Sequence, residues 1–96
     1  MYAQVITAHI RPTKLEEFAT TFSHVILPAI SREHGFKSIY VMQDAAQNKI
    51  TALVVWETES DAQTSIEGYL SQHLPKGANF LASQPSAETL EVILRA

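Results

Sequence analysis

The sequence contains no cysteine, and this absence excludes several kinds of protein. A chain without cysteine has no disulfide framework, no thiolate metal site and no cysteine nucleophile. The longest purely apolar run, residues 52–56, is far too short to span a membrane. The first residues also lack the basic region and apolar core of a signal peptide. We therefore expect a soluble cytoplasmic protein that makes no membrane contact.

Basic residues and glycines are few, and both are scattered. Seven lysines and arginines stand against ten acidic residues, which gives a net charge of -3. A nucleic-acid surface needs a basic stripe, so nucleic acid is not an expected partner. The three glycines form no phosphate-binding loop, no two histidines have the spacing of metal ligands, and there is no GxSxG nucleophile elbow. No metal site is predicted.

The periodicity of apolar residues predicts one domain over residues 1–96. Four segments are rich in β-branched and aromatic residues with a two-residue alternation, which is typical of strands. Two further segments repeat apolar residues every three or four positions, which is typical of amphipathic helices. Strands are expected at residues 2–10, 36–43, 49–57 and 87–94, one helix between the first two strands, and a second helix from Thr58 or Ser60 to about residue 73.

The sequence predicts where the first helix starts, where it ends and where it is irregular. Thr13 and Glu16 have the spacing of a capping box, so we expect the Thr13 hydroxyl to accept from the Glu16 amide. Pro28 interrupts the apolar stripe, lacks an amide hydrogen and crowds the carbonyl of His24. The helix should therefore kink or tighten within a turn of Pro28, and Gly35 should end it.

The element order β-α-β-β-α-β predicts an α+β fold of the ferredoxin-like class. A four-stranded antiparallel sheet in that fold carries both helices on one face and leaves the other bare. Strand 49–57 is apolar on both sides, with Val54 and Trp56 on one and Leu53 and Val55 on the other. A bare apolar face is too large for a monomer, so we expect a homodimer in which two sheets face each other as a dimeric α/β barrel.

Three short segments resemble the antibiotic biosynthesis monooxygenase family. They are His34-Gly35-Phe36, the strand end at residues 54–57 with the capped helix start that follows, and Ser71-Gln72-His73. The family includes cofactor-independent oxygenases of aromatic polyketides or quinols, haem-degrading enzymes, and proteins of no established activity. The resemblance implies a homodimer that acts on an aromatic or quinone-like molecule with no cofactor. The alternative is a noncatalytic dimeric module that binds a small hydrophobic ligand or a protein partner.

The resemblance also implies a catalytic position. Members have a pocket between the helices and the sheet, and a histidine near the end of the second helix is frequent, which corresponds to His73. This imidazole could transfer protons, or it could only interact with the helix dipole. Haem-degrading members use an asparagine on the first strand and a tryptophan in the second helix. Here those places hold Thr7 and Ser65 or Ile66, which argues against haem degradation.

Further residues could line such a pocket. Thr7 and His9 share a strand face, although the alternation does not determine whether that face is the inner one. Trp56 could contact substrate, but an anchor under the second helix is the favoured interpretation. Tyr40 is expected on the same face as Phe36, as core or as pocket wall. The candidate substrate-binding residues are Thr7, His9, Phe22, Tyr40, Trp56 and Phe80. An interior filled by Phe22, Tyr40 and Phe80 would favour the noncatalytic alternative.

Overall fold

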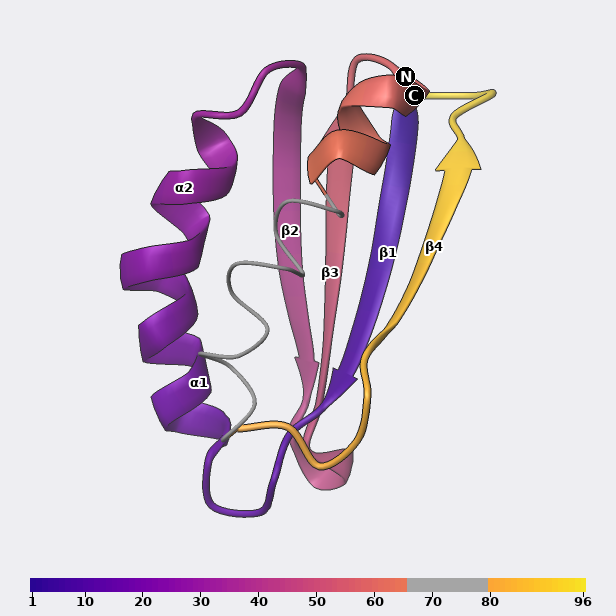
Figure 1. Ribbon diagram of the computed structural model, residues 1–96. Coiled ribbons are helices and arrows are strands. Elements are labelled where there is room, and N and C mark those ends of the chain that lie inside the picture. The colour runs from indigo at the N-terminus through magenta and orange to yellow at the C-terminus, as the bar shows by residue number, and fades with distance from the viewer. Residues whose placement is uncertain (66–79) are drawn as a thin grey trace.

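The computed structural model describes residues 1–65 and 80–96, which form an antiparallel sheet of four strands. The strands are β1 (Tyr2–His9), β2 (Phe36–Asp44), β3 (Lys49–Trp56) and β4 (Ser86–Glu91). They lie in the order β2-β3-β1-β4, so β3 and β1 are central (Figure 1). The chain has the predicted ferredoxin-like α+β fold.

The first helix is one continuous run of three segments, α1 (Leu15–Thr21), the π-helical turn η1 (Phe22–Ile26) and α2 (Leu27–Ser31). In the π turn, the amide of Leu27 donates to the carbonyl of Phe22, five residues earlier. Pro28 lies in the first turn of α2 and has no amide hydrogen to donate to the preceding turn, and the widened π turn directly before it accommodates the proline ring. The predicted deviation near Pro28 is present, as a widening of the helix and not as a tightening.

The wide turn also keeps the apolar stripe on the sheet. Phe18 and Ile30 are twelve residues apart, and in a straight α-helix they would point roughly 120° away from each other. A π turn holds one residue more than an α turn, which corrects most of this drift. As a result Phe18 packs near the start of the helix and Ile30, only 5 % exposed, packs near its end.

The predicted cap of the first helix is wrong, whereas Thr58, one of the two predicted starts of the second helix, does cap that helix. Thr13 has a positive φ of 71°, and Lys14 takes the N-cap position without a side-chain hydrogen bond. A threonine in that conformation does not present its hydroxyl to the first turn. At the second helix, which covers residues 59–65 of the described chain, the amide of Asp61 donates to the Thr58 hydroxyl at 3.1 Å.

Both helices cover the same face of the sheet, and two clusters of buried side chains fill the space beneath them. The upper core joins α2, β3 and the second helix through Ile30, Ala52, Val54, Trp56 and Ala62. The lower core lies toward α1 and contains Ala8, Ile10 and Ile50, with Phe18 and Phe80 packed against them. The even-numbered residues of β3 therefore face the helices, and the odd-numbered residues face away. We call the opposite surface the outer face.

A bulge changes the phase of β2. Phe36 pairs with Trp56, but the next pair is Ser38 with Val55, so Lys37 is an extra residue. Beyond the bulge Tyr40 pairs with Leu53 and therefore lies on the outer face. The prediction that Tyr40 shares a face with Phe36 is wrong, because strict alternation does not allow for the inserted residue.

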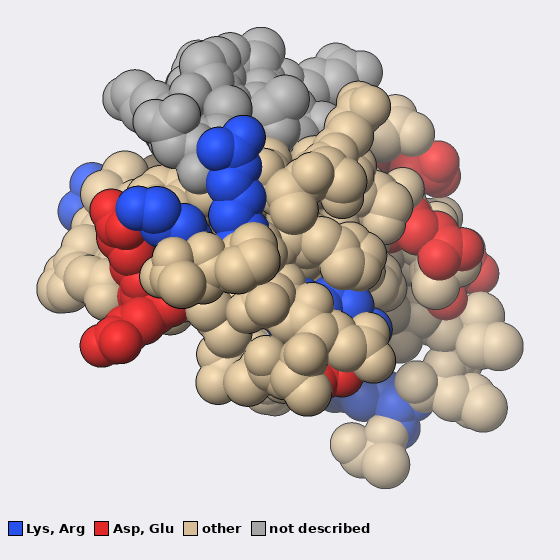
Figure 2. Space-filling model, turned by 90° about the horizontal axis from the view of Figure 1, so that it is seen from below, with Lys and Arg blue, Asp and Glu red and all other residues tan. Residues whose placement is uncertain are grey.

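The charged side chains form no single-sign patch where they can be seen. Viewed from the end that carries the β2–β3 turn, an acidic and a basic group touch at one edge, and the other charged side chains are spread among uncharged residues (Figure 2). Within residues 1–65 and 80–96, no helix is both long and apolar enough to cross a membrane.

Candidate functional site

The interior between the helices and the sheet is packed almost entirely with apolar side chains. Among the described residues, only Gln4 and Ser65 are polar and buried, and no buried side chain is titratable. Within the described residues, this interior therefore supplies apolar surroundings without a buried titratable group.

Trp56 is a structural anchor, as its favoured interpretation predicts. Its side chain is completely buried in the upper core, and its ring stacks edge to face on Phe36 with centroids 5.9 Å apart. The indole Nε1 donates to Gln4 Oε1 at 2.9 Å, and Gln4 Nε2 donates to the carbonyl of Ala62. Gln4 therefore bridges β1, β3 and the second helix. Sequence reasoning missed it, although a glutamine in phase with the buried residues of β1 was the available signal.

Two of the predicted substrate contacts come together near the lower core. Phe18 lies between Phe22 and Phe80, with ring centroids 5.9 Å and 6.0 Å away. Phe22 and Phe80 are both only partly buried, so part of each ring can contact a molecule from outside the core. These three rings form an aromatic cluster that joins α1, the π turn and the segment before β4.

Three other candidate residues, all of the sheet, lie away from this cluster. Thr7 pairs with Thr51 and with Ser86, which assigns Thr7 to the outer face. His9 is exposed, and by alternation it lies on the same side as Thr7. Tyr40 also lies on the outer face and is 62 % exposed. His73 lies outside the described residues.

The outer face is apolar across three strands. Tyr40, Leu53 and Val5 follow one another across β2, β3 and β1, and Val55, Ala3 and Leu90 form a second row across β3, β1 and β4. The side chains of Tyr40, Met42 and Leu90 are 62 %, 48 % and 48 % exposed. A surface of this composition is typical of one that is covered in the functional assembly.

One corner of the molecule joins two of the segments on which the family resemblance rests. Nδ1 of His34 lies 2.8 Å from Oδ1 of Asp61, and the Thr58 hydroxyl donates to Oδ2 of Asp61 at 2.9 Å. The hydrogen bond to Asp61 and its charge raise the pKa of His34 above its usual value. The same hydrogen bond, with that from Thr58, lowers the pKa of Asp61.

A second ion pair lies beside this corner. Lys37 Nζ is 2.7 Å from Glu57 Oε2, and this contact lowers the pKa of Glu57. The amide of Glu57 donates to the carbonyl of Gly35 at 2.8 Å. The loop before β2 and the segment after β3 are thus tied together by backbone and side-chain contacts.

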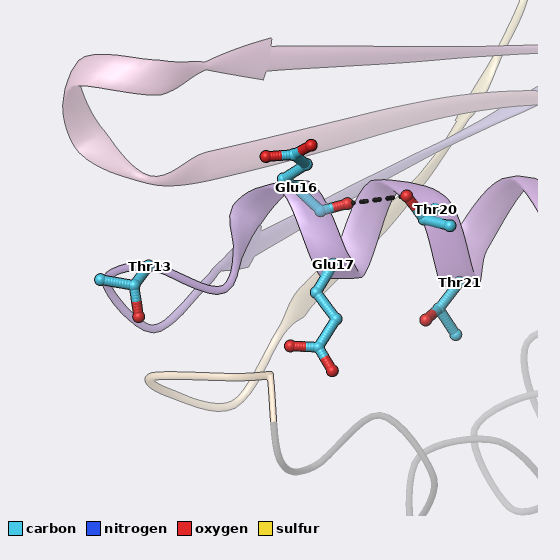
Figure 3. A pocket seen from close by; sticks show the side chains of 5 residues that line it. All are labelled: Thr13, Glu16, Glu17, Thr20 and Thr21. Atoms are coloured by element: carbon cyan, nitrogen blue, oxygen red, sulfur yellow. Dashed lines mark hydrogen bonds between the residues drawn. The ribbon is translucent and has the colours of Figure 1, made fainter.

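A shallow depression on α1 does not have the geometry of a site. It is lined by Thr13, Glu16, Glu17, Thr20 and Thr21. Figure 3 shows the Glu16 and Glu17 carboxylates pointing to opposite sides of the helix, while the Thr20 hydroxyl donates to the Glu16 carbonyl. The two carboxylates cannot hold one ion between them. Elsewhere in the described ranges, no three histidine, aspartate or glutamate side chains form a metal-binding group.

Comparisons with known proteins agree with this architecture. Residues 1–71 match the family model of the antibiotic biosynthesis monooxygenases. A search of curated proteins finds no match. Among solved structures, a protein of unknown function from Nitrosomonas europaea has a TM-score of 0.83 at 18 % identity, over 99 % of this chain and 91 % of that one. The haem degrader MhuD of Mycobacterium tuberculosis, with two haems in its active site, has a TM-score of 0.79 at 17 % identity, over 100 % and 99 %. These structural similarities concern the fold.

Proposed function

Because the chain belongs to the antibiotic biosynthesis monooxygenase family, we propose that it is a small cofactor-independent monooxygenase acting on an aromatic or quinone-like molecule. The family match over residues 1–71 is the observation that carries this proposal. It is supported by the apolar interior between helices and sheet and by the partly exposed aromatic cluster at its lower end. Flat, electron-rich rings pack well against such side chains.

The proposed reaction needs one proton-transfer group and an apolar surrounding. His73 takes a proton from an activated CH₂ or hydroxyl group of the substrate, and the resulting anion reacts with dioxygen. For a CH₂ group, one oxygen atom enters the product as a carbonyl and the other leaves as water. For a hydroquinone, one oxygen atom enters at a ring C–H position to give a hydroxyquinone, and the other leaves as water. In both cases the substrate supplies all the electrons. Phe22 and Phe80 contact the ring and exclude water from the anion.

The protein should act as a homodimer that pairs through the outer face. The exposed Tyr40, Met42 and Leu90 side chains support this arrangement, because a second copy would remove them from water. In such a dimer Thr7, His9 and Tyr40 line the space between the two sheets. Their contact with substrate would then depend on the second copy.

Haem degradation is not part of the proposal. Thr7 and Ser65 stand where haem-degrading members have an asparagine and near where they have a tryptophan. Ser65 is only 4 % exposed, and its small side chain offers no ring to a porphyrin. The described residues therefore do not fit a haem group. The haem bound by MhuD is a property of that protein.

A noncatalytic dimeric binding module is the second candidate. It is favoured by one observation, the lack of a titratable side chain in the helix-covered interior of the described residues. Trp56 and Gln4 hold each other and are not available to a ligand. Under this alternative the aromatic cluster binds a small hydrophobic molecule that is released unchanged.

Oxygen uptake with a panel of hydroquinones and anthrones tests the proposal. Wild-type protein should turn over at least one of them, and His73→Ala should lower turnover by roughly a hundredfold or more, as expected for the loss of a general acid or base. His24→Ala is the matched control, since His24 lies exposed on the π turn. Wild-type turnover that His73→Ala leaves unchanged would remove His73 from the mechanism. No turnover of any panel member would favour the binding module.

A further inference from the structure

The start of the second helix is held by contacts from two separate parts of the chain. From the sheet, Gln4 donates to the carbonyl of Ala62. From the loop between α2 and β2, His34 contacts Asp61 across 27 residues of sequence. The first of these contacts is buried and uncharged. The second involves two titratable groups, so the attachment of the helix on this side depends on their charges.

The two partners of the second contact differ greatly in exposure. The Asp61 side chain is 13 % exposed, whereas that of His34 is 94 % exposed. Asp61 is fixed by Thr58, which accepts from its amide and donates to its carboxylate. Its carboxylate also lies directly against Gly35, where any added Cβ would collide with it. The carboxylate is therefore held in place, while the imidazole remains open to solvent and can exchange its proton freely.

We propose that the His34–Asp61 pair is a pH-dependent latch between the loop before β2 and the second helix, closed by the charged imidazole and weakened when that imidazole loses its proton. The bond is charge-assisted at both ends only while His34 is protonated and Asp61 is ionised. The neutral imidazole still donates one hydrogen bond, so the latch weakens without breaking.

The neighbouring charges favour the closed state. Glu57, at the end of β3, adds to the negative potential at His34, and Lys37 of β2 neutralises it in part at 2.7 Å. Glu33 belongs to the same loop as His34, and Glu59 belongs to the first turn of the second helix. Of these four groups only Lys37 is positively charged, and it is paired with Glu57.

The direction of the pH dependence follows from the shifts in the pKa values of His34 and Asp61. The pKa of His34 is raised, so its contribution is complete below the ordinary histidine value and is lost as the pH rises through the raised pKa. The pKa of Asp61 is lowered, so its contribution is present above the ordinary aspartate value and is lost as the pH falls through the lowered pKa. The latch is therefore strongest in mildly acidic solution.

The first test is an NMR titration of the histidine rings in the wild-type protein and in Asp61→Asn. Asparagine keeps the size of the side chain and can still accept a hydrogen bond from Thr58, while it removes the charge and replaces one acceptor oxygen with an amide donor. The midpoint of His34 should lie above about 6.5 in the wild type and fall to about that value in the variant. An equal midpoint in both proteins would overturn the proposal.

The second test measures the helix itself and does not depend on any enzymatic turnover. Amide hydrogen exchange of residues 59–65 is followed from pH 5.5 to 8.5 and corrected for the intrinsic pH dependence of exchange. Wild-type protection should fall by about two- to fivefold over this range, the size expected for one exposed ion pair. His34→Gln should remove that pH dependence, whereas His24→Gln should retain it. Protection that falls equally in His34→Gln would overturn the latch even if the helix is intact.

Discussion

Replacing Gln4 with leucine should destabilise the protein more than any exposed polar-to-apolar change. Gln4 is 1 % exposed and lies at the centre of the upper core. Leucine has a similar volume, so the change removes hydrogen bonds without opening a large cavity. The buried indole N–H of Trp56 then has no acceptor, and the carbonyl of Ala62 loses its side-chain donor.

The magnitude follows from these two groups. A buried donor left without a partner costs about 1–3 kcal/mol. The carbonyl adds less, because a buried carbonyl oxygen is less costly to leave without one of its partners than a buried N–H. We therefore expect a loss of about 2–4 kcal/mol in the free energy of unfolding, which is a large part of the 5–15 kcal/mol typical of a small domain.

The assay is urea denaturation followed by tryptophan fluorescence. Trp56 is the only tryptophan in the sequence, so the signal reports on the upper core itself. All proteins are compared at one concentration, because dimerisation makes the midpoint concentration-dependent. Gln63→Leu is the matched control, since Gln63 is exposed on the second helix and should change stability by less than about 0.5 kcal/mol. If Gln4→Leu is as stable as the wild type, the bridge does not contribute to stability and the reasoning is refuted.

Two further substitutions test other parts of the structure. Tyr40→Glu should weaken the proposed dimer by about tenfold or more, because it would bury a charge on the outer face. Val25→Glu, on the exposed side of the π turn, should leave dimerisation unchanged. Sedimentation equilibrium that shows equal dimerisation of both variants would argue against pairing through the outer face. Gly35→Ala should lower the free energy of unfolding by about 1–3 kcal/mol, since φ is +80° and the Asp61 carboxylate occupies the space of the new methyl group. Urea denaturation at the wild-type midpoint would contradict this.

Periodicity was sufficient to predict the element order and the two faces of β3. The strands observed at residues 2–9, 36–44, 49–56 and 86–91 lie within three residues of the predicted bounds. The Thr58–Asp61 cap was also predictable, because both partners lie in four consecutive residues. Local patterns such as these depend on residues that are close in sequence.

Features that depend on distant residues could not be predicted in the same way. Gln4 and Trp56 are 52 residues apart, and no local rule identifies a glutamine as the partner of an indole. Thr13 and Glu16 have the spacing of a capping box, but Thr13 does not adopt the conformation of a cap, because the turn after Arg11 gives it a positive φ. The orientation of Thr7 and His9 required the register between strands, which alternation alone does not provide.

The bulge at Lys37 has a consequence for the comparison of distant relatives. An alignment at 17–18 % identity can shift by one residue in a strand without losing its overall match. Along β2 such a shift exchanges the two faces of the sheet, so that a residue aligned with Tyr40 could lie either under the helices or on the outer face of its own protein. Residue roles should therefore be transferred to or from β2 only where the inserted residue itself has been located in both structures. The same caution is unnecessary for β3, whose pairing with β1 runs without interruption from Lys49 to Trp56.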